Sequence, residues 1–205
     1  MKPVLVLYAT REGHTKCIAE YLTGKIQSLS LPARLLEVTQ LPNGVSLVDY
    51  SAVVLAASVH VGKHEPEIVR FVRRHRADLN QMRTAFLSVS LSQAGAQDTQ
   101  ATSESRAKAA ADVKSMIDTF LADTGWKPTL VQPVAGALMY SKYNVLVRFI
   151  MKRIARRTGA STDISCDHVF TRWRDLDHLL LKLLAKETAR PDWVTEPVRT
   201  AHSCS

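Results

Sequence analysis

Short runs of apolar residues alternate along this chain with segments in which apolar residues recur every three or four positions. The apolar runs occupy residues 4–9, 33–38, 51–58, 84–91 and 129–137, with a further short piece at 168–170. The segments with helical spacing lie at residues 15–27, from 65 onward, at 103–123 and at 176–184. The runs predict strands and the spaced segments predict amphipathic helices. This alternation favours a parallel sheet with helices on both faces.

The helical segments each carry an apolar stripe that we expect to face the sheet. The predicted stripes are Ile18, Ala19, Leu22 and Ile26 in the first helix, Ala110, Val113, Ile117, Phe120 and Leu121 in the helix at 103–123, and Leu176, Leu179, Leu180, Leu183 and Leu184 in the last. The run at 51–58 is apolar at nearly every position. Such a run is typical of a strand that is buried on both faces.

One domain accounts for the whole pattern, because 205 residues are enough for a single full core. We expect residues 1–189 to form it, with an insertion at about 137–165 that interrupts or follows the fifth strand, and residues 190–205 to form a loose tail. We expect neither a signal peptide nor a transmembrane helix, since no apolar run approaches 18 residues. Cys17, Cys166 and Cys204 lack metal or redox spacing, so we expect no metal site and a reduced cytoplasmic setting.

The segment Thr10-Arg11-Glu12-Gly13-His14-Thr15 directly follows the first apolar run and has the chemistry of a phosphate loop. The two threonines offer hydroxyl donors, Gly13 lets the backbone approach closely, and the next helix adds free N–H groups and a positive dipole end. Neither G-x-G-x-x-G nor G-x-x-x-x-G-K-[ST] occurs here. T-x-x-G-x-T is instead the pattern of flavodoxins, where it encloses the terminal phosphate of FMN. The alternative is an ordinary turn with Thr15 as the helix cap.

Two further loops, at residues 58–64 and 90–100, follow the third and fourth apolar runs. Doubly wound sheets bind ligands beyond the carboxyl ends of their strands, so these loops and the first should lie together. In an FMN protein the first loop would hold the phosphate and the other two would flank the isoalloxazine ring.

With these loops placed, the chain resembles the flavodoxin-like, menaquinone-dependent protoporphyrinogen oxidases of bacteria over about residues 3–187. The carriers of the resemblance are the first loop, Ala57-Ser58-Val59-His60-Val61-Gly62-Lys63-His64, Ala85-Phe86-Leu87-Ser88-Val89-Ser90-Leu91, Ala135-Gly136-Ala137-Leu138-Met139-Tyr140, the basic helix that follows, and Thr162-Asp163. The resemblance implies a flavodoxin-like, doubly wound, five-stranded parallel sheet of order 2-1-3-4-5. It also implies an FMN enzyme that oxidises protoporphyrinogen IX to protoporphyrin IX in haem synthesis and passes electrons to menaquinone or another quinone.

The candidate FMN-binding residues come from the three loops. They are Thr10, Arg11, Glu12, Gly13, His14 and Thr15 in the first, Ser58, Val59, His60 and Gly62 in the second, and Ser90, Leu91, Ser92, Gln93 and Gly95 in the third. Soluble flavodoxins usually place aromatic rings on the second and third loops, and here neither carries Trp or Tyr. A less covered flavin is easier for a bulky substrate to reach, which favours an enzyme over an electron shuttle.

Four side chains near these loops have two interpretations each. Arg11 could pair with phosphate or face water, and His14 could donate to phosphate or point to solvent. His60 and His64 could line the flavin pocket, assist proton removal from the substrate, or simply be exposed. No residue is assigned as catalytic base, because the flavin would carry the redox chemistry.

Six of the residues that give the chain its net charge of +8 lie between positions 137 and 162, a stretch without acids. They are Lys142, Arg148, Lys152, Arg153, Arg156 and Arg157. Residues 144–158 form a helical pattern with an apolar face, which is typical of a helix lying on an anionic membrane surface. The alternatives are a helix packed on the domain with a solvated basic face, or nucleic-acid binding. No nucleic-acid motif accompanies the charge, so we expect no nucleic-acid partner.

The preferred interpretation is a cytoplasmic enzyme held peripherally on the inner face of the cell membrane. The competing hypotheses are an NAD(P)H-dependent quinone or flavin reductase, a small electron carrier, and a non-enzymatic module that keeps the fold. The basic charge disfavours the carrier, because such proteins are typically acidic. The sequence leaves a homo-oligomer open.

Overall fold

A five-stranded parallel sheet forms the centre of the computed structural model, which describes residues 1–42, 45–138 and 168–185. The strands lie in the order β2 (Ala33–Glu37), β1 (Val4–Ala9), β3 (Ala52–His60), β5 (Arg83–Ser90) and β6 (Leu130–Ala135). All four neighbouring pairs are parallel. The predicted order 2-1-3-4-5 is confirmed, because β5 and β6 are its fourth and fifth strands.

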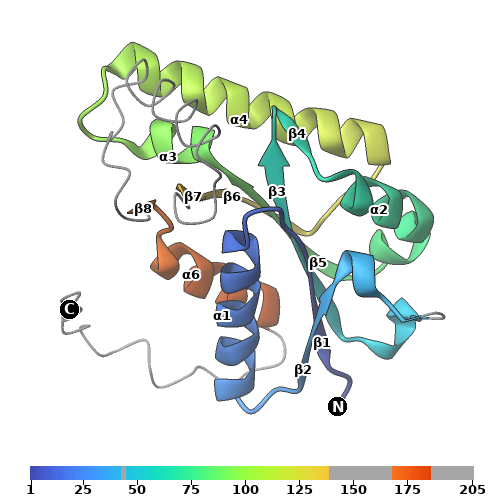
Figure 1. Cartoon of the computed structure of the whole chain (residues 1–205). Helices are drawn as coiled ribbons and strands as arrows, with labels where there is room; N and C mark the ends of the chain where they lie inside the picture. Colours follow the sequence, from blue (N-terminus) through green and yellow to red (C-terminus); the bar gives the residue numbers. More distant parts are fainter. Residues whose placement is uncertain (43–44, 139–167, 186–205) are drawn as a thin grey trace.

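Helices cover both faces of the sheet (Figure 1). On one face α1 (His14–Ser28) and α6 (Trp173–Leu184) pack against alternate residues of the strands, including Val4, Val6 and Tyr8. On the other face α2 (Pro66–Leu79) and α4 (Ser103–Thr124) pack against the intervening residues, such as Leu5 and Leu7. The strands are therefore buried on both sides, as their continuous apolar runs indicate.

The apolar stripes predicted for α1 and α6 are buried in full. In α4 the residues Val113, Ile117 and Phe120 are buried, but the prediction for Ala110 is wrong because that residue is exposed. The reason is visible in Figure 1, where the first half of α4 lies over α3 (Leu91–Gln97) instead of over the sheet.

The second and third loops contain more regular structure than expected. β3 continues to His60 and pairs with the antiparallel strand β4 (Lys63–His64), so the second loop is a hairpin whose turn is formed by Val61 and Gly62. The third loop is largely the helix α3. Two short 3-10 helices, η1 (Val38–Gln40) and η2 (Leu47–Asp49), occupy the connection from β2 to β3.

The fifth predicted strand is divided at Gly136. It comprises β6 and the short strand β7 (Ala137–Leu138), which pairs antiparallel with β8 (His168–Val169). The six basic residues of the expected insertion and the predicted tail at 190–205 lie outside the described residues. Across the part of the chain that the structure describes, no helix combines the length and the apolar character that crossing a bilayer requires.

Candidate functional site at the carboxyl edge of the sheet

The three predicted loops meet at one edge of the sheet. Ala9 at the end of β1 pairs with Ala57 of β3, and the next residue, Ser58, pairs with Val89 of β5. Ser90 in turn pairs with Ala135 of β6. The register thus places the first loop, Ser58 and Ser90 side by side at the carboxyl ends of the strands, where doubly wound proteins bind ligands.

The first loop is held by its own threonine. The hydroxyl Oγ1 of Thr10 accepts a hydrogen bond from the N–H of Gly13 at 2.9 Å. Gly13 is the N-cap of α1 and has φ 91°, a left-handed conformation that glycine adopts without steric cost. The helix begins at His14, so Thr15 lies inside its first turn and the alternative role of Thr15 as N-cap is wrong.

The N-terminus of α1 fits the phosphate of FMN. Among the described residues no side chain caps this helix, and no acid lies in its first turn. Ser90 and Thr102 cap α3 and α4 through their hydroxyls. The helices α2 and α6 also lack a side-chain cap, but each has an acid in its first turn, Glu67 and Asp175. The first N–H groups of a helix have no partner within it, and His14 and Thr15 are buried. A negatively charged group at this position would accept from these donors and face the positive end of the dipole.

The first loop is tied to the second by a buried carboxylate, Glu65. This residue is only 3% exposed and precedes α2. Its Oε2 accepts from Nε of Arg11 at 2.8 Å, and its Oε1 accepts from Oγ of Ser58 at 3.0 Å. The bond to Glu65 raises the pKa of Arg11. Arg11 is 52% exposed and uses only its Nε in this bond, so the side chain also faces water, and its pairing with phosphate stays a prediction.

A second contact joins the same two loops. Nδ1 of His60 lies 3.5 Å from Oε1 of Glu12. The His60 side chain is 51% exposed, so its ring remains accessible at the edge of the site.

Gly62 has φ 75° and Val61 has φ 48°, which assigns Gly62 to the hairpin turn.

The ring of His14 is hydrogen-bonded to Thr171, which follows the region 139–167 in the chain. Its Nε2 lies 2.7 Å from Oγ1 of Thr171, and that hydroxyl donates to the carbonyl of Ala135 at 2.7 Å. Because the hydroxyl proton is used on Ala135, Nε2 of His14 is the donor to Thr171. Burial lowers the pKa of His14, which favours the neutral ring. His14 is buried, so the interpretation in which it points to solvent is wrong, whereas its contact with phosphate stays a prediction.

His64 lies in the core, not on a loop surface. Its Nε2 is 2.8 Å from Oγ of the buried Ser88, and its ring contacts Phe86 and Phe120 with centroids 5.2 and 4.8 Å away. Burial lowers its pKa to about 4. The interpretation of His64 as an exposed residue is wrong, because pairing of β4 with β3 turns this side chain inward. Its role in lining the flavin pocket stays a prediction.

The third loop contributes a capped helix. Oγ of Ser90 accepts from the N–H of Gln93 at 3.2 Å, and Leu91 is exposed at the start of α3. Ser92 and Gln93 are half-buried on the same helix. Gly95 faces α4, and a Cβ at this position would lie 3.6 Å from Cβ of Ala109, an ordinary van der Waals contact.

The backbone of Phe170 is connected to the carboxyl end of β5 through Gly136. The N–H of Gly136 donates to the carbonyl of Ser90 at 3.0 Å, and the N–H of Phe170 donates to the carbonyl of Gly136 at 3.1 Å. Phe170 is 37% exposed. Glu65, Thr171 and Phe170 were not predicted as site residues; the apolar piece at 168–170 was the only sequence signal for any of them.

Residues 5–165 match the model of a known family, the flavodoxin domain. The chain belongs to this family. It is 30% identical over 172 residues to "Protoporphyrinogen IX dehydrogenase [quinone]" of Escherichia coli (strain K12), covering 84% of this chain and 89% of the relative. A relative of the same name from Leishmania major is 32% identical over 171 residues, covering 82% of this chain and 69% of the relative. The flavodoxin of Fusobacterium nucleatum, solved bound to flavin mononucleotide, is 14% identical with a TM-score of 0.41, covering 63% of this chain and 70% of that one.

Membership of the flavodoxin family confirms several predictions. The flavodoxin-like fold, the class of flavin-dependent oxidoreductases and FMN as the type of cofactor all agree with it. The resemblance to protoporphyrinogen oxidases is confirmed by the two relatives. The individual cofactor-binding residues stay predictions.

Proposed function

We propose that this flavodoxin-family protein oxidises protoporphyrinogen IX to protoporphyrin IX in haem biosynthesis, using FMN and passing the electrons to a quinone. The observation that carries the proposal is the uncapped N-terminus of α1 at the carboxyl edge of the sheet. It is supported by relatives named for this reaction that align over most of their length.

The chain's own residues hold the cofactor from its phosphate end. Gly13 and the first turn of α1 receive the phosphate, and Thr10 fixes the loop around it. Ser58 to His60 and Ser90 to Gln93 flank the ring from two neighbouring strands. Bound FMN supplies a two-electron acceptor, while the protein supplies position and electrostatics.

His60 is positioned to accept a proton from the substrate. Each oxidation of a porphyrinogen removes two electrons and two protons. If one proton leaves with the electron pair as a hydride, the other needs an acceptor at the edge of the site. His14 is bonded to Thr171 and His64 to Ser88, both in buried positions. Only His60 of these three is exposed, and Oε1 of Glu12 lies 3.5 Å from its Nδ1.

The rim of the site suits an apolar substrate. Four exposed large apolar residues border this edge: Val61 and Leu91 directly follow β3 and β5, and Val169 and Phe170 lie in and after β8, which pairs with β7. Such a rim lowers the cost of bringing an apolar macrocycle or a quinone ring to the cofactor.

The basic segment 137–162 holds the enzyme at the inner face of the membrane in this proposal. A quinone acceptor dissolves in the bilayer, and clustered Lys and Arg side chains bind anionic lipid headgroups. The segment lies outside the described residues, so the support is its sequence pattern alone.

An anaerobic assay tests the reaction. FMN-loaded protein is mixed with protoporphyrinogen IX and a menaquinone analogue, and porphyrin fluorescence is followed against a control without protein, because the substrate oxidises spontaneously. Fluorescence that rises faster only with protein and quinone supports the proposal. Rapid bleaching of bound flavin by NAD(P)H, without a response to protoporphyrinogen IX, would show another flavin reductase. Protein that stays colourless after incubation with FMN would remove the cofactor as well.

A further inference from the structure

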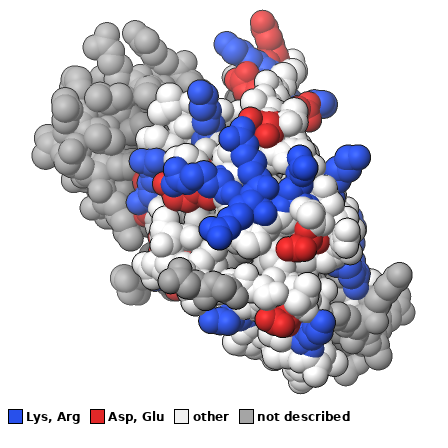
Figure 2. Space-filling model, turned by 90° about the vertical axis from the view of Figure 1, so that its right-hand side faces the viewer, with Lys and Arg blue, Asp and Glu red and all other residues white. Residues whose placement is uncertain are grey.

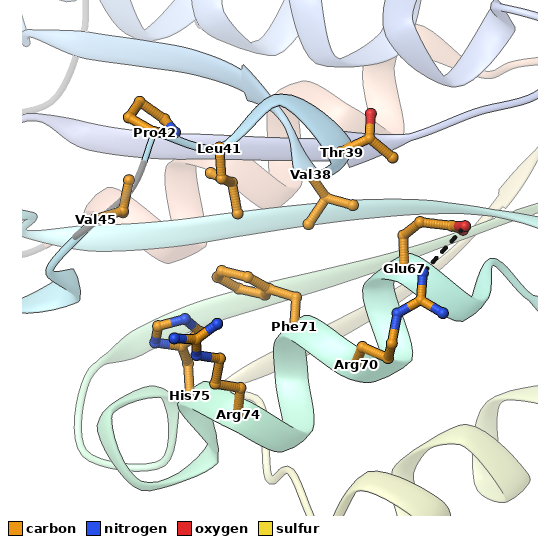
Figure 3. Close-up of a pocket in the computed structure, with 10 residues that line it drawn as sticks. All are labelled: Val38, Thr39, Leu41, Pro42, Val45, Glu67, Arg70, Phe71, Arg74 and His75. Carbon is orange, nitrogen blue, oxygen red and sulfur yellow. Dashed lines mark hydrogen bonds and ion pairs between the residues drawn. The ribbon is translucent and has the colours of Figure 1, made fainter.

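A cavity of about 570 Å³ lies between α2 and the segment that follows β2 (Figure 3). Its apolar lining includes Val38, Leu41, Val45 and Phe71. Arg70 and Arg74 of α2 stand at its border, and Figure 3 shows both on the side of the helix that faces the cavity. A volume of this size is typical of small-molecule sites, which range from about 300 to 1,000 Å³.

The border of this cavity carries excess positive charge. Four exposed arginines, Arg70, Arg73, Arg74 and Arg76, crowd α2, and Figure 2 shows Lys and Arg gathered over this face. Arg73 is paired with Asp123, and Arg70 lies 3.4 Å from Glu67. Among the described residues, Arg74 forms no ion pair with a carboxylate.

The cavity is separate from the candidate cofactor site. Glu65, at the start of α2, belongs to the carboxyl edge through its bonds to Arg11 and Ser58. Arg70 and Arg74 lie five and nine residues further along the chain, more than one turn away down the helix. A ligand can therefore occupy the cavity without replacing any residue of the first, second or third loop.

We propose that this cavity binds a small amphipathic carboxylate, a molecule that joins an apolar body to one acidic group. The apolar body lies on Val38, Leu41 and Phe71, and the carboxylate is held by the guanidinium groups of Arg70 and Arg74. Guanidinium forms charge-assisted, bidentate hydrogen bonds with carboxylates, which favours this class over neutral or cationic molecules. Glu67 competes for Arg70 and weakens the site.

Calorimetric titration of the full chain with decanoate tests the proposal. The double variant Arg70→Gln/Arg74→Gln should bind decanoate at least about tenfold more weakly than the wild type, and decanol should bind at least about tenfold more weakly than decanoate. Glu67→Gln should bind decanoate several-fold more tightly because it frees Arg70. The control Lys108→Gln/Lys127→Gln removes the same charge from exposed positions on and after α4, and should leave the affinity unchanged.

Three results would overturn this assignment. The first is no decanoate binding up to about 1 mM, a concentration at which only very weak sites remain empty. The second is an Arg70→Gln/Arg74→Gln variant that binds decanoate as tightly as the wild type. The third is a lysine control that loses as much affinity as the arginine variant. Vesicles of phosphatidylglycerol provide a further arm. Binding to them that depends on Arg70 and Arg74, without decanoate binding, would assign this surface to a membrane and contradict a small-molecule site. FMN content is measured on every variant. A variant that keeps FMN but shows one of these results contradicts the cavity proposal alone and leaves the cofactor proposal intact.

Discussion

Nε of Arg11 donates to Oε2 of Glu65 at 2.8 Å, which joins the first loop of the site to the residue that precedes α2. The other carboxylate oxygen of Glu65 accepts from Ser58 at the end of β3. One buried carboxylate thus fixes the relative positions of two loops that come from different strands. Protein groups alone make these contacts, which hold the edge of the sheet in a defined shape.

Removing this carboxylate should destabilise the domain. In Glu65→Ala, Arg11 loses its charged acceptor and Ser58 loses the closer of its two acceptors, so we expect the free energy of unfolding to fall by about 1–3 kcal/mol. Urea unfolding without FMN measures it. Glu20→Ala is the control, because Glu20 pairs with Lys16 on an exposed helix face, where such pairs contribute about 0.5 kcal/mol or less. An unfolding midpoint in Glu65→Ala no lower than in the control would contradict the structural role of Glu65.

The hydroxyl of Thr10 should matter for cofactor affinity. Thr10→Val removes the acceptor for the N–H of Gly13, which loosens the loop that receives the phosphate. We expect the dissociation constant for FMN to rise roughly tenfold, equivalent to about 1.4 kcal/mol. Titration by flavin fluorescence quenching measures it. Thr10→Ser keeps the hydroxyl and should stay within about threefold of the wild type. Equal affinities in the valine and serine variants would show that this hydrogen bond does not shape the site.

The local pattern of apolar and polar residues was sufficient to predict the sheet and the first loop. β1 has the predicted bounds, and β3 and β5 agree closely at their starts, because a strand buried on both faces must be apolar at nearly every position. The roles of Thr10 and Gly13 in the loop could be predicted equally well, because a turn between a strand and a helix is built from residues close together in sequence.

Contacts between distant residues could not be predicted in this way. Glu65 is 54 residues from Arg11, and Thr171 is 157 residues from His14. No periodicity connects such pairs, because the sheet alone brings them together. His64 was misassigned for a related reason: its burial depends on β4, a strand of only two residues with no recognisable pattern of its own.

Burial of His64 should make stability depend on pH. The folded protein keeps this ring neutral down to its lowered pKa of about 4, whereas an unfolded histidine binds a proton below about pH 6.5. Between these values the unfolded chain holds more protons, so stability is complete above pH 6.5 and decreases as the pH falls toward 4, by on the order of 3 kcal/mol. His14, whose pKa is also lowered, contributes in the same direction.

The variant His64→Gln tests this dependence. The quantity compared is the slope of the unfolding free energy against pH, and not the unfolding free energy at one pH. Unfolding free energies measured from pH 7 to pH 4 should decline less steeply in His64→Gln than in the wild type. His178→Gln removes a histidine from the exposed face of α6 and controls for the substitution itself. Parallel curves for His64→Gln and the wild type would show that His64 does not titrate differently on unfolding.

The basic segment should bind the protein to anionic vesicles. Changing Arg148, Lys152, Arg153, Arg156 and Arg157 to Gln removes five positive charges, each of which contributes about 1 kcal/mol near an anionic surface. We therefore expect the variant to stay in the supernatant when vesicles rich in phosphatidylglycerol are sedimented, while the wild type pellets. Neutral phosphatidylcholine vesicles are the control. Unchanged sedimentation would remove the membrane proposal and leave the flavin proposal intact.

Phe170 should affect the substrate and not the fold. Its backbone is connected to Ser90 through Gly136, and the residue is 37% exposed. Phe170→Ala removes apolar contact area from the rim, so we expect KM for protoporphyrinogen IX or for the quinone to rise about three- to tenfold, with the unfolding midpoint unchanged. Val131→Ala is the matched control, because Val131 is 39% exposed but lies within β6, away from the carboxyl edge. A KM that shifts equally in both variants, or in neither, would place Phe170 outside the path of the substrate.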